Sequence, residues 1–121
     1  EEMVIPKFTL QPLVENYFVH GVDHKRKDNV ISIKVRRVGE AVEIRVQDNG
    51  RGMEPNQLQR IQQILSHRDP REEVEESKER QSIGIVNVHE RFLLYFGDRY
   101  HIQITSEKGK GVLYTITIED T

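Results

Sequence analysis

The chain has 121 residues, and its 18 basic and 20 acidic side chains leave a net charge of only −2. This length fits one domain, and the near balance of charge gives no general attraction to nucleic acid or to an anionic membrane surface. The lack of cysteine excludes a disulfide scaffold, and no apolar run approaches the roughly 20 residues that span a bilayer.

Apolar spacing in the first half of the chain predicts a strand, a helix and a hairpin. Residues 3–5 form a short apolar run ended by a proline, which favours a brief edge strand. Between residues 9 and 20, apolar side chains recur at helical spacing. Residues 30–38 and 41–46 are rich in strand-forming residues, and the glycine-containing turn between them predicts that they pair as a hairpin.

The second half predicts two helices and a final pair of strands. The pattern indicates a loop at 48–52, helices at 55–67 and 83–96, and strands at 100–106 and 112–118. Between the two helices, residues 68–80 carry six acidic and four basic side chains, with Val74 as the one apolar residue. Such a charged stretch gains little from burial, and we therefore predict a mobile, lid-like loop over residues 66–82.

The order of these elements defines a fold class. Because neighbouring strands are linked by hairpins, we predict a mixed, mainly antiparallel sheet of about five strands. Three helices should cover one face of this sheet. The fold class is then a two-layer α/β sandwich, and residues 1–121 should form a single domain.

The first predicted helix carries two polar residues that could contact a ligand. Asn16 lies in the middle of the helix, where asparagine is a neutral-to-poor choice, and His20 follows one turn later on the same face. The amide oxygen of Asn16 could ligate Mg²⁺, which prefers oxygen ligands, and His20 could donate to a phosphate oxygen. The alternative is that Asn16 is a capping or surface residue and that His20 merely ends the helix.

A second candidate site follows the predicted hairpin. The carboxylate of Asp48 could accept a hydrogen bond from the 6-amino group of adenine, whereas the 6-oxo group of guanine would be repelled. Gly50 and Gly52 would let the backbone adopt positive φ and approach a bound base closely. The alternative is an ordinary Asx turn, because Asp-Asn-Gly is a common turn sequence.

A third candidate site lies where the long second-half helix begins. Gly84 is expected to start this helix, whose free amides could face phosphate groups. The alternative is a simple junction between a loop and a helix. Arg91, one turn after Asn87, is expected to form a packing ion pair, and Lys108 and Lys110 are expected to be solvated at a hairpin tip.

Together these segments resemble a known superfamily. Four stretches appear in the family order, at 10–21, 48–53, 83–91 and 109–111. They are similar to the asparagine box and the glycine boxes of the GHKL ATPases, the superfamily of gyrase, Hsp90, histidine kinases and MutL. Leu-Gln-Pro-Leu-Val-Glu-Asn with a following His-Gly, and Gly-Ile-x-Asn-x-x-x-Arg, look most like LytS/YesM-type sensor histidine kinases.

The resemblance implies the Bergerat ATP-binding fold, with ATP and Mg²⁺ as ligands and an ATP lid at about residues 66–82. It also implies a set of nucleotide-binding residues, with Asn16 as the Mg²⁺ ligand. The set is Asn16, His20, Asp48, Gly50, Gly52, Met53, Gly84 and Ile85.

The implied function is that of the catalytic domain of a two-component sensor kinase. Such a domain presents the γ-phosphate of Mg·ATP to a histidine on an upstream dimerisation domain, expected to lie outside this chain, within a homodimer of the full-length kinase. A response regulator then receives the phosphoryl group. The domain would be cytoplasmic, on a parent in the bacterial inner membrane, without contacts of its own to membrane or nucleic acid. His89 lies inside the second glycine box, so we do not expect it to be the phosphoacceptor.

Several positions depart from the family pattern. Val19 replaces a common lysine, Pro12 stands where hydrolytic members place a glutamate, and Val112 replaces an adenine-binding threonine. Arg80 and Ser82 occupy glycine positions of the second glycine box. These changes argue against a hydrolytic ATPase and predict weak nucleotide binding. Two alternatives therefore stay open: a degenerate interaction domain that does not bind ATP, and an anti-sigma-factor serine kinase.

Overall fold

The computed structural model describes residues 10–25, 27–68 and 80–119, with the backbone alone for residues 19, 20 and 80–83. Their strands form one antiparallel sheet with the order β1-β2-β4-β3. The strands are β1 (Ile31–Val38), β2 (Ala41–Asp48), β3 (Tyr100–Glu107) and β4 (Gly111–Glu119). Both predicted hairpins are thereby confirmed. The described residues contribute four strands, and the expected edge strand at 3–5 lies outside them.

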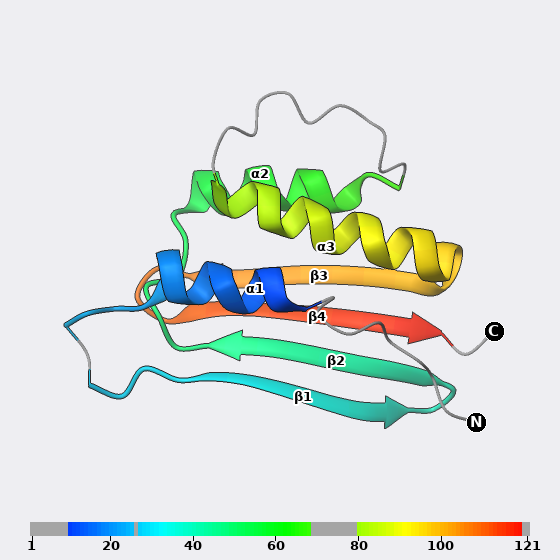
Figure 1. Cartoon of the computed structure of the whole chain (residues 1–121), viewed down its shortest axis with the longest axis horizontal. Helices are drawn as coiled ribbons and strands as arrows, with labels where there is room; N and C mark the ends of the chain where they lie inside the picture. The colour runs from blue at the N-terminus through cyan, green and yellow to red at the C-terminus, as the bar shows by residue number, and fades with distance from the viewer. Residues whose placement is uncertain (1–9, 26, 69–79, 120–121) are drawn as a thin grey trace.

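The helices lie on one face of the sheet, as predicted (Figure 1). They are α1 (Gln11–Asn16), α2 (Pro55–Ser66) and α3 (Arg80–Phe96). A turn of π-helix (Tyr17–Gly21) continues α1, and a short 3-10 turn (Gly97–Arg99) leads from α3 into β3. The predicted fold class, a two-layer α/β sandwich, is confirmed for this part of the chain. None of the described helices is long and apolar enough to cross a membrane.

The core lies between the two layers because each element turns its apolar positions inward. On β4, every second side chain is buried, at positions 112, 114, 116 and 118. The strand register sets Ile116 opposite Ile44 of β2. On α3, Ile85, Val88 and Phe92 are buried at spacings of three and four residues, which is the period of a helix. The other face of the sheet is polar, with an ion pair between Arg36 and Glu43.

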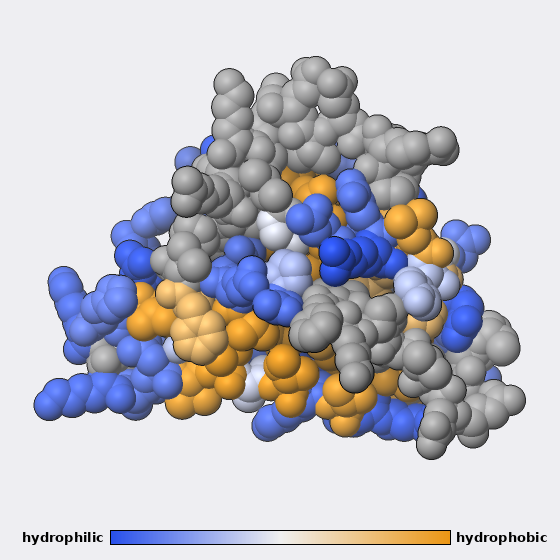
Figure 2. Space-filling model, viewed as in Figure 1, coloured by the Kyte–Doolittle hydropathy of each residue, from blue (hydrophilic) through white to orange (hydrophobic). Residues whose placement is uncertain are grey.

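The sheet extends beyond the helices at its β1 edge. Ile33 and Val35 pair with residues of β2 whose side chains are buried beneath the helices. They remain 47% and 62% exposed because β1 is the outer strand of the described sheet. Figure 2 shows apolar surface along this edge, below α1. Apolar side chains are therefore accessible on the helix side of β1.

Two helix boundaries differ from the expectation in the region of the proposed lid. Helix α2 ends at Ser66, and α3 begins at Arg80, three residues before the predicted start at 83. Both ends of the predicted lid at 66–82 are therefore helical. Residues 69–79 lie outside the described part of the chain, so a lid over them stays a prediction.

Candidate functional site

Asp48 is the last residue of β2, and its side chain is only 9% exposed. It continues the alternation of the buried residues Ile44 and Val46, so its carboxylate faces the helix layer. Its Oδ1 atom accepts a hydrogen bond of 2.8 Å from the backbone amide of Gly50. Burial raises the pKa of the Asp48 carboxyl, although the backbone amides of Gly50 and Val112 partly oppose this rise. The site therefore contains a largely desolvated carboxylate with a fixed orientation.

The buried hydroxyl of Tyr114 lies in the same environment. Burial raises the pKa of this hydroxyl, and the nearby charge of Asp48 raises it further. Tyr114 pairs with Val46 across the sheet and shares the helix-facing side of β4. A phenol beside the carboxylate was not predicted from the sequence, because the two residues meet only through the register of β2 and β4.

The loop after Asp48 is enclosed by backbone from two distant segments. The amide of Arg51 donates to the carbonyl of Gly21 at 2.7 Å, and the amide of Gly109 donates to the carbonyl of Arg51 at 2.7 Å. A Cβ atom at Gly50 would collide with the Gly21 carbonyl oxygen. At Gly52, where φ is +70°, a Cβ atom would collide with the Glu107 carbonyl oxygen. These two predicted glycines are therefore required by close backbone approach.

The turn between β3 and β4 completes this enclosure. Gly111 has φ of +98°, and a Cβ atom there would collide with the backbone carbonyl of Asp48. The hydroxyl of Ser106 accepts the amide of Met53 at 2.9 Å and donates to the Gly111 carbonyl at 2.7 Å. No local signal in the sequence indicated that Ser106 would have this role. Residues 109–111, the fourth stretch of the family resemblance, therefore contact the second stretch, residues 48–53, directly.

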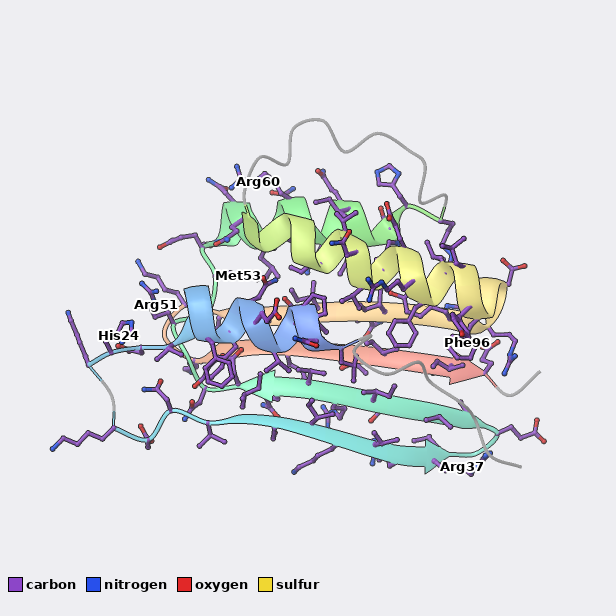
Figure 3. All side chains as sticks on the ribbon, in the orientation of Figure 1. His24, Arg37, Arg51, Met53, Arg60 and Phe96 are labelled. Carbon is purple, nitrogen blue, oxygen red and sulfur yellow. The ribbon has the colours of Figure 1, made fainter. Side chains whose placement is uncertain are left out.

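Met53 and Arg51 point in different directions from this loop. The side chain of Met53 is buried and belongs to the hydrophobic core, whereas Arg51 is exposed. Figure 3 shows Met53 between the helix layer and the sheet, with Arg51 pointing outward. Met53 therefore anchors the loop to the core in addition to being a predicted nucleotide contact.

Asn49 ties the same loop to the segment before β1, a role that the sequence analysis missed. Its side-chain oxygen accepts the Val30 amide at 2.8 Å, and its side-chain nitrogen donates to the Asp28 carbonyl at 2.7 Å. Because these partners lie about twenty residues away, only the Asp-Asn-Gly turn signal was available from the sequence.

Asn16 and Gly84 lie against each other where α1 meets α3. A Cβ atom added to Gly84 would be 3.1 Å from Oδ1 and 3.3 Å from Nδ2 of Asn16. Two residues that were predicted separately to bind nucleotide are thus in contact. The structure describes only the backbone of His20, so the role of its side chain stays a prediction.

The expectation that Gly84 starts a helix is wrong. Helix α3 begins at Arg80, which makes Gly84 its fifth residue. Only the first four amides of a helix lack partners within it, so the amide of Gly84 is not one of the free donors. Ile85, the next predicted residue, is 1% exposed and packs in the core. The free amides of α3 belong to its first turn.

A depression of about 390 Å³ lies beside Asp48, at the end of β2 and along the turn between β3 and β4. Its lining includes Gln47, Thr105 and Leu113, whose positions alternate with the buried positions of their strands. Asp48, Ser106 and Gly111 line it as well, so this depression adjoins the candidate site.

His89 forms a buried polar network at the opposite end of the helix layer. It is 3% exposed, its Nε2 atom lies 2.6 Å from the His67 carbonyl, and its Nδ1 atom lies 2.9 Å from the Tyr100 hydroxyl. A neutral ring with the proton on Nε2 satisfies both contacts, because the carbonyl can only accept. The guanidinium of Arg68 donates to the carbonyls of Tyr100 at 2.7 Å and Gly97 at 3.1 Å. Both ring nitrogens are engaged, which supports the expectation that His89 is not a phosphoacceptor.

This network predicts a pH dependence of folding. Burial lowers the pKa of His89 from its ordinary value of 6.5, the His67 carbonyl opposes this, and the charges of Arg68 and His67 lower it further. The unfolded chain therefore binds this proton more tightly than the folded chain. The contribution of His89 to stability should be complete above pH 6.5 and should be lost as the pH falls toward the folded-state pKa.

Urea unfolding at several pH values between 7.5 and 5 would measure this effect. His89→Gln should lower the unfolding free energy at pH 7.5 by about 1–3 kcal/mol and flatten its decline at acidic pH. The exposed His24 provides the control, because His24→Gln removes an imidazole without disturbing this network. An unaltered pH slope in the His89 variant would contradict the assignment.

The comparisons with known proteins agree with this geometry. The family model for histidine kinase-, DNA gyrase B- and HSP90-like ATPases matches residues 7–121. The sensor histidine kinase YpdA of Escherichia coli is 35% identical over 99 residues, which are 82% of this chain and 15% of that protein. The sensor histidine kinase YesM of Bacillus subtilis is 35% identical over 115 residues, which are 95% of this chain and 17% of that protein.

A solved structure shares the fold. The histidine kinase domain of the Erythrobacter litoralis EL346 blue-light activated histidine kinase aligns with a TM-score of 0.58 over 93% of this chain and 42% of that one, at 15% sequence identity. The chain belongs to the histidine kinase-, DNA gyrase B- and HSP90-like ATPase family. Its relatives include LytS/YesM-type sensor histidine kinases. It spans less than a fifth of the length of these relatives.

Proposed function

We propose that this domain binds Mg·ATP and presents the γ-phosphate to a histidine on a separate dimerisation domain of the same protein. The observation that carries the proposal is the buried Asp48 carboxylate, held by the Gly50 amide beside a loop in which Gly50 and Gly52 have no room for a side chain. Because a carboxylate is costly to bury without hydrogen-bond partners, a buried one is suited to recognise a specific hydrogen-bond donor on a ligand.

Asp48 would select adenine by its hydrogen-bonding pattern. A carboxylate accepts hydrogen bonds, so it favours the 6-amino group of adenine and repels the 6-oxo group of guanine. The amide of Gly50 already occupies one oxygen and fixes the orientation of the carboxylate. The Val112 amide also bonds this carboxylate, and the remaining lone pairs of its two oxygens would be available to the base.

Asn16 would bind Mg²⁺ through its side-chain oxygen. The described residues contain no cluster of three or more acidic, histidine or cysteine side chains that could hold a metal ion. An ion here would therefore need the oxygens of a nucleotide as its other ligands, as is usual for Mg²⁺. The carboxamide of Asn16 lies beside Gly84, close to the first turn of α3 and its free amides, which fits such a site. When bound, the ion would neutralise charge on the phosphates.

The remaining contributions of the domain would be positioning. His20, Met53 and Ile85 are the other proposed nucleotide contacts, and the segment between α2 and α3 would form the lid. The phosphoryl group would pass to the dimerisation domain within a homodimer and then to a response regulator. We also propose that the domain is cytoplasmic and that its parent is a membrane-bound bacterial sensor kinase. The relatives are sensor proteins and sensor histidine kinases, which supports this proposal over an anti-sigma-factor kinase.

Calorimetric titration of the domain with ATP, ADP and GTP in Mg²⁺ would test the proposal. ATP and ADP should bind, and GTP should bind at least about tenfold more weakly, because an unpaired or repelled polar group in a buried site costs about 1–3 kcal/mol. Absence of binding by all three nucleotides would favour a degenerate interaction domain. Equal binding of ATP and GTP would contradict the role of Asp48.

A further inference from the structure

Gly84 occupies a position where its own backbone does not require glycine. It is the fifth residue of α3, and its φ lies outside the left-handed region that favours glycine. Glycine is also the poorest helix former after proline, so alanine would suit the helix better at this position. The reason for glycine must therefore come from a neighbour of Gly84.

That neighbour is the carboxamide of Asn16. An added Cβ atom would lie 3.1 Å from its Oδ1, 3.3 Å from its Nδ2 and 3.5 Å from its Cγ atom. All three nearest atoms belong to one side chain, so the carboxamide lies across the place that a Cβ atom would take. Contacts of 3.1 and 3.3 Å are tighter than ordinary packing, and a methyl group at residue 84 would push the carboxamide aside.

We propose that Gly84 is a positioning residue: its missing side chain forms the seat that holds the Asn16 carboxamide in its metal-binding orientation. The proposal rests on the proposed Mg²⁺ role of Asn16. The second torsion of asparagine is broad and weakly restricted, so the surface against which the carboxamide of Asn16 packs helps to fix the direction of its oxygen. Helix α3 supplies that surface, and α1 supplies the ligand. This assigns to Gly84 a role that acts through Asn16, in place of direct phosphate binding by its amide.

A double-mutant cycle of Gly84→Ala and Asn16→Ala would test the inference. ATP affinity is measured for each variant in Mg²⁺ and in EDTA, together with the melting temperature. Gly84→Ala should weaken Mg·ATP binding roughly tenfold, the order of one lost polar contact, and leave binding in EDTA unchanged. Its melting temperature should stay level or rise because alanine favours the helix. In the Asn16→Ala background, Gly84→Ala should have no further effect.

Leu94→Ala is the matched control, because Leu94 is 77% exposed on the same helix. It should leave nucleotide binding in Mg²⁺ and in EDTA unchanged. A second measurement requires no nucleotide. The side-chain amide resonances of Asn16 in the free protein should shift in Gly84→Ala and stay in place in Leu94→Ala.

The outcomes separate the inference from the function on which it rests. If Asn16→Ala weakens Mg·ATP binding but Gly84→Ala does not, or if the Asn16 resonances do not move, the seat is refuted and the metal role stands. If Gly84→Ala weakens binding equally with and without Asn16, Gly84 acts on the nucleotide directly, and the inference is overturned. If Asn16→Ala has the same effect in Mg²⁺ and in EDTA, the proposed metal role itself fails.

Discussion

Asp48→Asn should weaken ATP binding by about tenfold to a hundredfold, while the melting temperature of the domain should not fall. The variant keeps the size of the side chain and an oxygen that can accept the Gly50 amide. It replaces the oxygen proposed to face the adenine amino group with an amide nitrogen that donates. The base and the protein would then present two donors to each other, a mismatch that costs about 1–3 kcal/mol in a buried site.

The stability expectation follows from the pKa of Asp48. Burial raises this pKa, so the ionised carboxylate is less favourable in the folded chain than in the unfolded chain. Removing the charge relieves that penalty at neutral pH. Titration calorimetry and thermal unfolding would measure both effects, with Asp98→Asn at an exposed position as the control. Normal ATP binding by the Asp48 variant would reduce Asp48 to a turn residue.

Gly111→Ala should destabilise the domain by about 2–5 kcal/mol, a large part of the 5–15 kcal/mol that is typical of a folded domain. Two effects combine at this position. Its φ of +98° is unfavourable for alanine, and the new Cβ atom would collide with the backbone carbonyl of Asp48. Because backbone cannot move aside as a flexible side chain does, relief would require the turn and the loop after β2 to separate.

Gly109 is a matched control for this change. It lies in the same turn with a φ of +83°, but a Cβ atom there would meet nothing within 4 Å. Gly109→Ala should therefore show only the conformational cost, about 1–2 kcal/mol. Urea unfolding of the two variants would isolate the effect of close approach. Equal losses would mean that backbone conformation, and not contact with Asp48, is the reason for glycine at 111.

The sequence predicted the elements whose apolar spacing is strong, and it placed boundaries less well. The predicted start of α3 is three residues too late. Residues 80–82, Arg-Gln-Ser, include no apolar side chain, so the periodic pattern does not reveal that the helix begins there. The apolar pattern therefore places Gly84 at the start of the helix, whereas the structure has it as the fifth residue. The contact with Asn16 gives a different reason for its presence, and no pattern within α3 reveals it.

The sequence predicted which residue types belong to the candidate site, but it did not predict the contacts between distant segments that build it. Asp48, Gly50 and Gly52 could be recognised because side-chain type and glycine spacing are local properties of the chain. The contributions of Ser106, Gly111 and Tyr114 depend on the register of β2 and β4 and on the turn beyond them. The π-helical turn at 17–21 was also missed, since its final carbonyl is held by the distant amide of Arg51. Such nonlocal contacts leave no signal at one position.

The backbone hydrogen bonds of Arg51 determine which substitutions this loop can tolerate. Arg51 joins Gly21 and Gly109 through its amide and its carbonyl, while its own side chain is exposed. Any residue except proline offers the same amide and carbonyl, so position 51 can change identity without altering the shape of the loop. The neighbours Gly50 and Gly52 have no such freedom, because each would place a Cβ atom on a carbonyl oxygen. A structurally central position can therefore be variable in sequence between two fixed glycines.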